Sequence, residues 1–234
     1  MNAERYIFYF CQMMEHTYNF LDDLAQALKN SLPAAKAHVK LAPHDRIEGL
    51  LDRVWPKDAK QSAVTCLLFI ENGSLKTLLM RRVEYDGVHS GQISFPGGKK
   101  DEGDKGLLGT AIREFYEETG VHLEEKDYLG ALSDLYIPPS NFLVQPYIAF
   151  LPSLPELRPE LAEVQELKKV SLEELFDPQY FKDEEILVRQ RSKHAYTIKA
   201  PCYHIKELCI WGATAMMISE LQMIIAENDL ILLQ

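Results

Sequence analysis

Apolar side chains recur every three or four positions through the first part of the chain, with charged and polar residues between them. This spacing predicts a helix with one apolar face. The positions on that face are Tyr6, Phe10, Met14, Tyr18, Leu21, Leu24 and Leu28. We expect this face to pack against the rest of the molecule or to form a dimer contact.

The next segment, residues 32–61, contains three prolines and mixed charge. It predicts a connector with one short helix between Arg46 and Val54. The pattern changes again near Ser62, where long apolar runs begin. We therefore expect a helical extension and connector over residues 1–58 and one main domain over residues 59–234.

Strand patterns dominate the start of this main domain. Residues 63–71 and 75–82 are apolar runs joined by an Asn-Gly-Ser turn, which predicts a hairpin. Residues 92–98 predict a third strand that ends in a Pro-Gly-Gly turn. Residues 107–120 predict a helix that ends at Gly120.

The remaining pattern mixes strands and helices. Residues 128–137 and 141–151 predict strands, with Pro146 marking an edge or a bulge. Residues 170–177 and 214–228 predict helices. Because strands and helices do not alternate regularly, the fold class is α+β or a mixed α/β sandwich. The chain contains neither the dinucleotide-binding glycine motif nor the P-loop motif, so these two phosphate-binding loops are excluded.

Three glutamates share one face of the helix predicted at residues 107–120. Residues three and four apart are neighbours on a helix, so Glu114, Glu117 and Glu118 bring their carboxylates together. One interpretation is a solvated acidic stripe in which Arg113 pairs with Glu117. The other is a metal site, because the preceding glycine turn lets the backbone approach closely, and carboxylate and carbonyl oxygens are ligands that Mg²⁺ or Mn²⁺ prefers.

Net charge and cysteine content limit the kinds of partner and the compartment that we expect. The 25 Lys and Arg residues against 35 Asp and Glu residues give a net charge of -10, which argues against binding to a nucleic-acid backbone. The four cysteines lack CxxC spacing, so we expect reduced thiols and a cytoplasmic protein. The apolar run at residues 6–14 follows Glu4, precedes no small-residue cleavage pattern and is shorter than the roughly 20 residues that cross a membrane, so no membrane association is predicted.

The glycine turn and the acidic helix together resemble the signature of the Nudix hydrolases. The second half of that signature, Arg-Glu-apolar-x-Glu-Glu-x-Gly-apolar, matches throughout from Arg113 to Val121. The first half departs twice, because Asp104 stands in place of a glutamate and one extra residue precedes Arg113. A shorter acid in this shifted register can still pair with Arg113. The resemblance implies an α/β/α sandwich, preceded here by the helical extension.

The resemblance also implies roles for the matching residues. Glu114 and Glu118 correspond to the principal metal ligands, and Glu117 to a further ligand or a water-orienting acid. The carbonyl of Gly97 corresponds to a backbone ligand, and Arg113 to the arginine that fixes the glutamates. The implied cofactor is Mg²⁺ or Mn²⁺, and the implied reaction is hydrolysis of a diphosphate in a small nucleotide-derived substrate.

Residues 78–98 resemble the additional motif of the coenzyme A pyrophosphatase branch of this family. The substrate-binding residues that this match implies are Arg82, Phe95, Gly98 and Lys99. The match fails at Met80 and Val83, and at Gly87, where the motif has an arginine. Arg81, Lys99 and Lys100 are candidates to replace that cation. Residues 138–150 and 208–221 also resemble this branch, although the second stretch equally fits a plain helix start with a buried Trp211.

The branch resemblance implies that a homodimer hydrolyses coenzyme A or acyl-coenzyme A to adenosine 3′,5′-bisphosphate and 4′-phosphopantetheine. Two alternatives stay open: a Nudix hydrolase of ADP-ribose, NADH or a nucleoside triphosphate, and a Nudix-fold binding module without catalysis. Glu163 fits either a loop acid that serves as ligand or base, or a solvated glutamate at a helix end. His89 fits either a phosphate contact or an exposed turn histidine.

Overall fold

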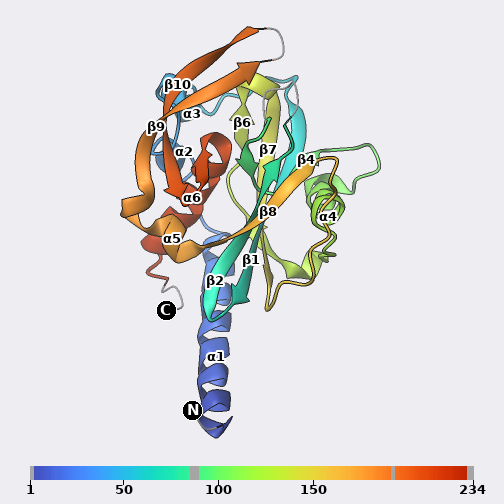
Figure 1. Ribbon diagram of the computed structural model, residues 1–234, viewed down its shortest axis with the longest axis vertical. Helices are drawn as coiled ribbons and strands as arrows, with labels where there is room; N and C mark the ends of the chain where they lie inside the picture. Colours follow the sequence, from blue (N-terminus) through green and yellow to red (C-terminus); the bar gives the residue numbers. More distant parts are fainter. Residues whose placement is uncertain (1–2, 85–89, 191–192, 231–234) are drawn as a thin grey trace.

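A mixed β-sheet lies between two layers of helices in the computed structural model (Figure 1). The structure describes residues 3–84, 90–190 and 193–230, and it describes side chains from Glu15 onward except at residues 45, 189–190 and 193–195. Within these residues, none of the helices is both long enough and apolar enough to cross a membrane. The predicted class, a mixed α/β sandwich with helices at the N-terminus, is confirmed.

Three long strands form the centre of the main sheet. β1 (Lys60–Glu71) pairs in antiparallel fashion with β2 (Ser74–Arg82) through the predicted hairpin, and in parallel with β7 (Phe142–Leu151). The sheet order is β3-β2-β1-β7-β5, and β4, β6 and β8 pair with β1, β7 and β2 respectively. The bounds of these shorter strands are β3 (Ile93–Ser94), β4 (Gly97–Lys99), β5 (Tyr128–Ala131), β6 (Leu135–Ile137) and β8 (Val164–Ser171).

Alternation along β1 explains the two helical layers, because successive side chains of a strand point to opposite faces. Leu67 and Phe69 belong to the cluster that packs under α4 (Gly106–Thr119), together with Phe115 of that helix. Cys66 and Leu68 belong to the larger cluster that includes α6 (Gly212–Glu227). The acidic helix is therefore fixed on one face of the sheet, and the last long helix covers the other.

A second, three-stranded sheet, which the sequence pattern did not predict, stands beside the first. It consists of β9 (Phe181–Gln190), β10 (Lys193–Ile205) and β11 (Leu208–Trp211) in the order β11-β10-β9. Tyr203, Ile205 and Ile210 bury one face in the core cluster shared with α6. The short helix α5 (Leu172–Phe176) precedes this sheet, as predicted.

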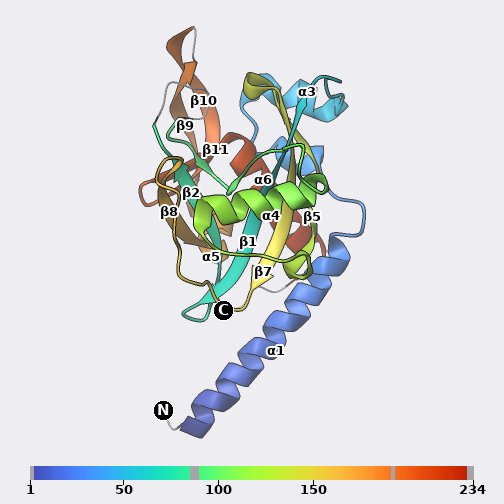
Figure 2. The ribbon, with the colours of Figure 1, turned by 90° about the vertical axis from the view of Figure 1, so that its right-hand side faces the viewer.

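The N-terminal helix α1 (Ala3–Ala27) extends away from the body of the molecule, and only its C-terminal part packs on it (Figure 2). Leu21, Leu24 and Leu28 are buried as predicted, whereas Tyr18 is 50% exposed and does not pack on the body of the molecule. A dimer contact through this part of the face stays a prediction. The side chains of the predicted apolar positions before Glu15 lie outside the described residues. The connector forms α2 (Ala35–His38), a 3₁₀ turn and α3 (Ile47–Asp52), and α3 falls where a short helix was expected.

Pro146 lies inside the sheet and not at its edge, because β7 has neighbours on both sides. On one side, however, β6 pairs with residues Phe142 to Val144 and β5 pairs with Tyr147 to Ala149. The proline therefore falls at the gap between two short strands, where the absence of its N–H costs no ladder hydrogen bond.

A buried carboxylate joins the connector to α6. Glu220 is fully buried and lies 3.1 Å from Nε2 of His38, while the backbone amides of Ala34 and Ser133 donate to its two oxygens at 3.0 and 3.1 Å. Burial alone raises the pKa of Glu220, but the hydrogen bonds from His38, Ser133 and Ala34 outweigh it and lower the pKa. The charged carboxylate is thus part of the folded core.

We predict that Glu220→Ala destabilises the protein by about 3 kcal/mol, because it leaves buried donors without an acceptor. The matched control is Glu227→Ala on the same helix. Glu227 forms an exposed pair with Lys36 and is itself 46% exposed, so its loss costs less than about 1 kcal/mol. Urea unfolding of both variants tests the difference, and equal effects would contradict the assigned role of Glu220.

Candidate active site

A buried hydrogen bond joins the glycine turn to the acidic helix. The backbone amide of Gly97 donates to Oε2 of Glu118 at 2.6 Å, although the two residues are 21 positions apart. Gly97 has φ 150°, and a Cβ on it would lie 2.3 Å from the carbonyl oxygen of Ala63, so this position requires glycine. The contact that the structure shows is made by the amide of Gly97, whereas the metal-binding role predicted for its carbonyl stays a prediction.

Gly98 lies directly against Glu114. A Cβ on Gly98 would come within 2.3 Å of Oε2 of Glu114, so the missing side chain is the space that the carboxylate occupies. The side chains become more buried across the acidic face, from 53% exposed at Glu117 to 15% at Glu114 and 2% at Glu118. The predicted solvated stripe therefore describes Glu117 but not the other two glutamates.

Arg113 holds this acidic cluster together. Its Nε and Nη2 donate to the two oxygens of Asp104 at 2.8 and 2.9 Å, and its Nη1 donates to Glu114 and to Glu117, each at 2.9 Å. The carbonyl of Lys99 accepts a further hydrogen bond from Nη2. A planar guanidinium suits this two-point contact with a carboxylate.

Asp104 forms this pair despite its shorter side chain and shifted register. Its oxygens also accept hydrogen bonds from the amide of Asp101 and the hydroxyl of Thr110, each at 2.9 Å. The hydrogen bonds from Arg113 hold the pKa of Asp104 well below its usual range. The two departures from the family signature are thus accommodated by a loop that closes on Asp104.

The buried glutamates have the opposite electrostatic property. Burial raises the pKa of Glu118 from 4.5 to about 8, more than Arg82 and the Gly97 amide lower it. Burial also raises the pKa of Glu114, against the effect of Arg113. Oε1 of Glu118 has no hydrogen-bond partner among the described residues, and Nη1 of Arg82 is 3.6 Å away. A buried carboxylate oxygen without a donor, beside a second half-buried carboxylate, fits a hard divalent cation.

A cleft of about 610 Å³ opens beside these carboxylates. Of the substrate-binding residues predicted from the sequence, Arg82, Gly98 and Lys99 line it. Phe95 also borders the cleft but is only 2% exposed, so it mainly packs in the core. Arg81, a proposed substitute for the missing arginine, lines a different cavity.

Other residues that line the cleft come from segments outside the signature motif. Glu163 lies in the turn before β8, not at a helix end, and its charge raises the pKa of both Glu114 and Glu118. Trp211 borders the cleft and is not buried. Gly212 begins α6 with φ 61°; it is buried, but a Cβ added to it would meet no atom within 4 Å. Arg46 reaches the cleft from the connector. Gly87 and His89 lie outside the described residues.

A sequence profile of the NUDIX domain matches residues 59–202, which is more than half of the chain. The chain belongs to the Nudix family. It is therefore a hydrolase of pyrophosphate bonds in small nucleotide-derived substrates, and Nudix enzymes typically use a divalent metal ion.

Curated relatives extend over most of the chain. An uncharacterized Nudix hydrolase NudL from Photorhabdus laumondii is 30% identical over 164 residues, covering 70% of this chain and 84% of the relative. The peroxisomal coenzyme A diphosphatase NUDT7 of Mus musculus is 31% identical over 158 residues, which is 66% of each chain. The crystal structure of a MutT/nudix family protein from Enterococcus faecalis has a TM-score of 0.52 at 14% identity, covering 78% of this chain and 69% of that one. This last similarity supports the fold.

We predict different effects of alanine at the two glycines of this Nudix turn. Gly98→Ala displaces only the flexible end of Glu114, so it leaves stability nearly unchanged but weakens Mg²⁺ binding by about tenfold or more. Gly97→Ala meets the backbone of Ala63, so it destabilises the protein by more than about 1 kcal/mol. Thermal unfolding without metal and Mg²⁺ titration measure the two effects.

The matched control is Gly103→Ala in the adjacent loop, because a Cβ there meets nothing within 4 Å. This variant is expected to keep both stability and Mg²⁺ affinity. If Gly98→Ala binds Mg²⁺ as the wild type does, Glu114 does not depend on the space that Gly98 leaves.

Proposed function

We propose that this Nudix hydrolase cleaves the diphosphate of coenzyme A or an acyl-coenzyme A, giving adenosine 3′,5′-bisphosphate and 4′-phosphopantetheine. The observation that carries the proposal is a cleft with an acidic, metal-compatible end and a long apolar side. The similarity to the coenzyme A diphosphatase NUDT7 supports the same substrate class.

The acidic end supplies the chemistry. Glu114 and Glu118 are the proposed principal ligands of Mg²⁺ or Mn²⁺, with Glu117 as a further ligand or water-orienting acid. When bound, such an ion neutralises charge on the diphosphate and lowers the pKa of a ligand water. Arg113, anchored on Asp104, donates to Glu114 and Glu117 and keeps them in place. Glu163 lines the same cleft, which supports it as a further ligand or as the base that accepts a proton from the attacking water.

The opposite side of the cleft suits an extended apolar chain. The apolar residues that line it come from the main sheet, from the β9–β10 pair and from α6. They include Ile137, Phe142, Val144, Val188, Ile198 and Met217. A nucleoside triphosphate has only its nucleobase to cover apolar surface, whereas the pantetheine and acyl parts of coenzyme A derivatives add a long chain that can do so.

Cations around the cleft offer contacts for the phosphates. Arg82 and Lys99 lie next to the carboxylate end, and Arg46 enters from the connector, where its Nη2 donates to the carbonyl of Tyr136 at 2.6 Å. Arg46 is thus a candidate for the cation that Gly87 lacks, and no sequence motif of the main domain indicated it. Homodimer formation and a cytoplasmic location stay predictions.

We predict that Glu118→Gln lowers Mg²⁺-dependent kcat/KM by at least about 100-fold while the protein stays folded. Glutamine keeps an oxygen that accepts from Gly97 but removes the charge that holds a cation. The same variant tests the burial of the carboxylate through stability measured against pH in the presence of a chelator.

The direction of the pH effect follows from the raised pKa. A group whose pKa rises from 4.5 to about 8 on folding stabilises the fold in its protonated form, and that stability is lost as pH rises through this interval. The Glu118→Gln variant does not lose this stability. The difference between its unfolding temperature and that of the wild type therefore shifts in favour of the variant as pH rises from 4.5 to 8. Parallel pH curves for the two proteins would contradict a buried Glu118 with a raised pKa.

The substrate is tested with a panel of coenzyme A, acetyl- and longer acyl-coenzyme A, ADP-ribose, NADH and a nucleoside triphosphate, each with Mg²⁺ or Mn²⁺. We expect the coenzyme A compounds to have the highest kcat/KM, with products identified by mass. Faster hydrolysis of ADP-ribose or NADH would support the second candidate substrate class. Absence of turnover on every compound would favour a binding module.

A further inference from the structure

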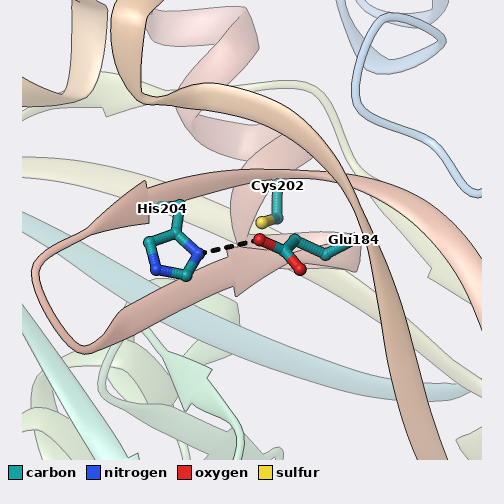
Figure 3. A group of neighbouring side chains, drawn as sticks. All are labelled: Glu184, Cys202 and His204. Carbon is teal, nitrogen blue, oxygen red and sulfur yellow. Dashed lines mark ion pairs between the residues drawn. The ribbon is translucent and has the colours of Figure 1, made fainter.

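Three metal-ligating side chains meet on the second sheet, away from the glutamate helix. Glu184 on β9 and Cys202 and His204 on β10 bring one donor atom each to within 4.8 Å of one another (Figure 3). Cys202 and His204 are two positions apart on one strand, so their side chains share a face. The opposite face of this sheet is buried through Tyr203 and Ile205.

One nitrogen atom of the cluster is buried without a hydrogen-bond partner among the described residues. Nδ1 of His204 is buried and has no hydrogen-bond partner among the described residues, although Oε1 of Glu184 lies 3.0 Å from it. The contact is an ion pair between two side chains that can each ligate a metal ion. Cys202 is 0% exposed, while His204 and Glu184 are 38% and 32% exposed. The ligand atoms are sheltered, but the site opens to solvent on one side.

A second thiol adjoins the cluster. Cys209 on β11 stands opposite His204 in the sheet, and its thiol interacts with that of Cys202. Glu184, His204 and Cys209 also border one cavity of about 430 Å³, which gives an ion a route to the site. The chain thus offers two sulfurs, one imidazole nitrogen and one carboxylate at neighbouring positions of three adjacent strands.

Lys182, on the same face of the sheet, competes with a metal ion for Glu184. Nζ of Lys182 lies 2.9 Å from Oε1 of Glu184, so an ion pair neutralises this carboxylate when no metal is bound. The pair is exposed, since Lys182 is 50% exposed, and such pairs contribute little to stability. A metal ion can therefore displace Lys182 at small cost.

We propose that Glu184, Cys202 and His204 bind one zinc-class divalent ion, with Cys209 as the fourth ligand. Thiolate and imidazole donors select Zn²⁺ over Mg²⁺, and four ligands give the closed tetrahedral arrangement of structural zinc. Bond lengths of about 2.0 to 2.3 Å place tetrahedral donors about 3.3 to 3.8 Å apart. Nδ1 of His204 and Oε1 of Glu184 are already 3.0 Å apart, and the ligand atoms of Glu184, Cys202 and His204 lie within 4.8 Å of one another, so these three need to close by about 1 Å at most. Cys209 lies outside this group of three, so its side chain moves further to reach the ion. The two thiols release their protons to solvent as the metal–sulfur bonds form.

This site does not depend on the proposed substrate, but it affects the same cleft. Val188 on β9 and Ile198 on β10 line the apolar side of the cleft, and the ion would join these two strands to β11. Its role is thus structural, because it fixes the second sheet, and it differs from the catalytic role proposed for the cation at the glutamates.

The test uses the full-length protein, reduced and freed of metal, titrated with Co²⁺ as a spectroscopic substitute for Zn²⁺. We expect one equivalent of Co²⁺ to give the thiolate-to-cobalt charge-transfer absorption, which a carboxylate site cannot produce, and one equivalent of Zn²⁺ to remove it. The glutamate variant Glu118→Gln keeps this absorption. Zn²⁺ also raises the unfolding temperature of the wild type, as any ligand of the folded state does.

The variants Cys202→Ser and His204→Gln lose the absorption or weaken Co²⁺ binding at least about tenfold, and Zn²⁺ no longer stabilises them. The matched control is Asp183→Asn. Asp183 precedes Glu184 and lies 3.7 Å from Nζ of Lys199, and we expect this variant to bind Co²⁺ as the wild type does. His204 is partly exposed, so His204→Gln is expected to fold even if Cys202→Ser does not. Absence of the absorption in the reduced wild type, or its full retention in His204→Gln, overturns the proposal.

Discussion

The site depends on one electrostatic constraint. Three glutamates of α4 bring their negative charges close together, and the guanidinium of Arg113 pairs with two of them, Glu114 and Glu117. Arg113 contacts Asp104 at two points and reaches Glu114 and Glu117 from the same group. Asp104 keeps its charge because Arg113 and Thr110 donate to it. The arginine thereby fixes the direction of the glutamates before any ligand binds, which reduces the entropy that binding must overcome.

Glu118 is the exception to this compensation. It is 2% exposed, its Oε1 lacks a hydrogen-bond partner among the described residues, and Arg82 stays 3.6 Å away. Burying a carboxylate in this way is unfavourable unless a cation joins it or it takes up a proton. The unfavourable burial is confined to this face of α4, because Gly98 leaves room for the carboxylate of Glu114, the amide of Gly97 donates to Glu118, and the core beneath α4 is apolar. A stable scaffold therefore carries an unfavourable charge at the position where we propose that a metal ion binds.

The cleft is lined by residues from many segments besides the signature motif. Its acidic end comes from α4 and β4, but its apolar side comes from the second sheet and from α6, and Arg46 comes from the connector. The connector in turn is held to α6 by the buried Glu220. The residues proposed to select the substrate are thus distributed over segments that are distant in the sequence, whereas the proposed catalytic charges lie within one helix and one turn.

The sequence by itself determined the local elements and the chemistry of the signature. Periodicity placed α4, α6 and the β1–β2 hairpin, and helical spacing placed Glu114, Glu117 and Glu118 on one face, because these features depend on residues close together in the chain. It did not predict β9 and β10, whose exposed charges hide the strand pattern, nor did it place Pro146 at the gap between β5 and β6. Only the tertiary structure decided which glutamate is buried, that Asp104 reaches Arg113, and that Glu184, Cys202 and His204 meet. Burial and pairing between strands arise from contacts across the fold, and the spacing of residues along the chain contains no record of them.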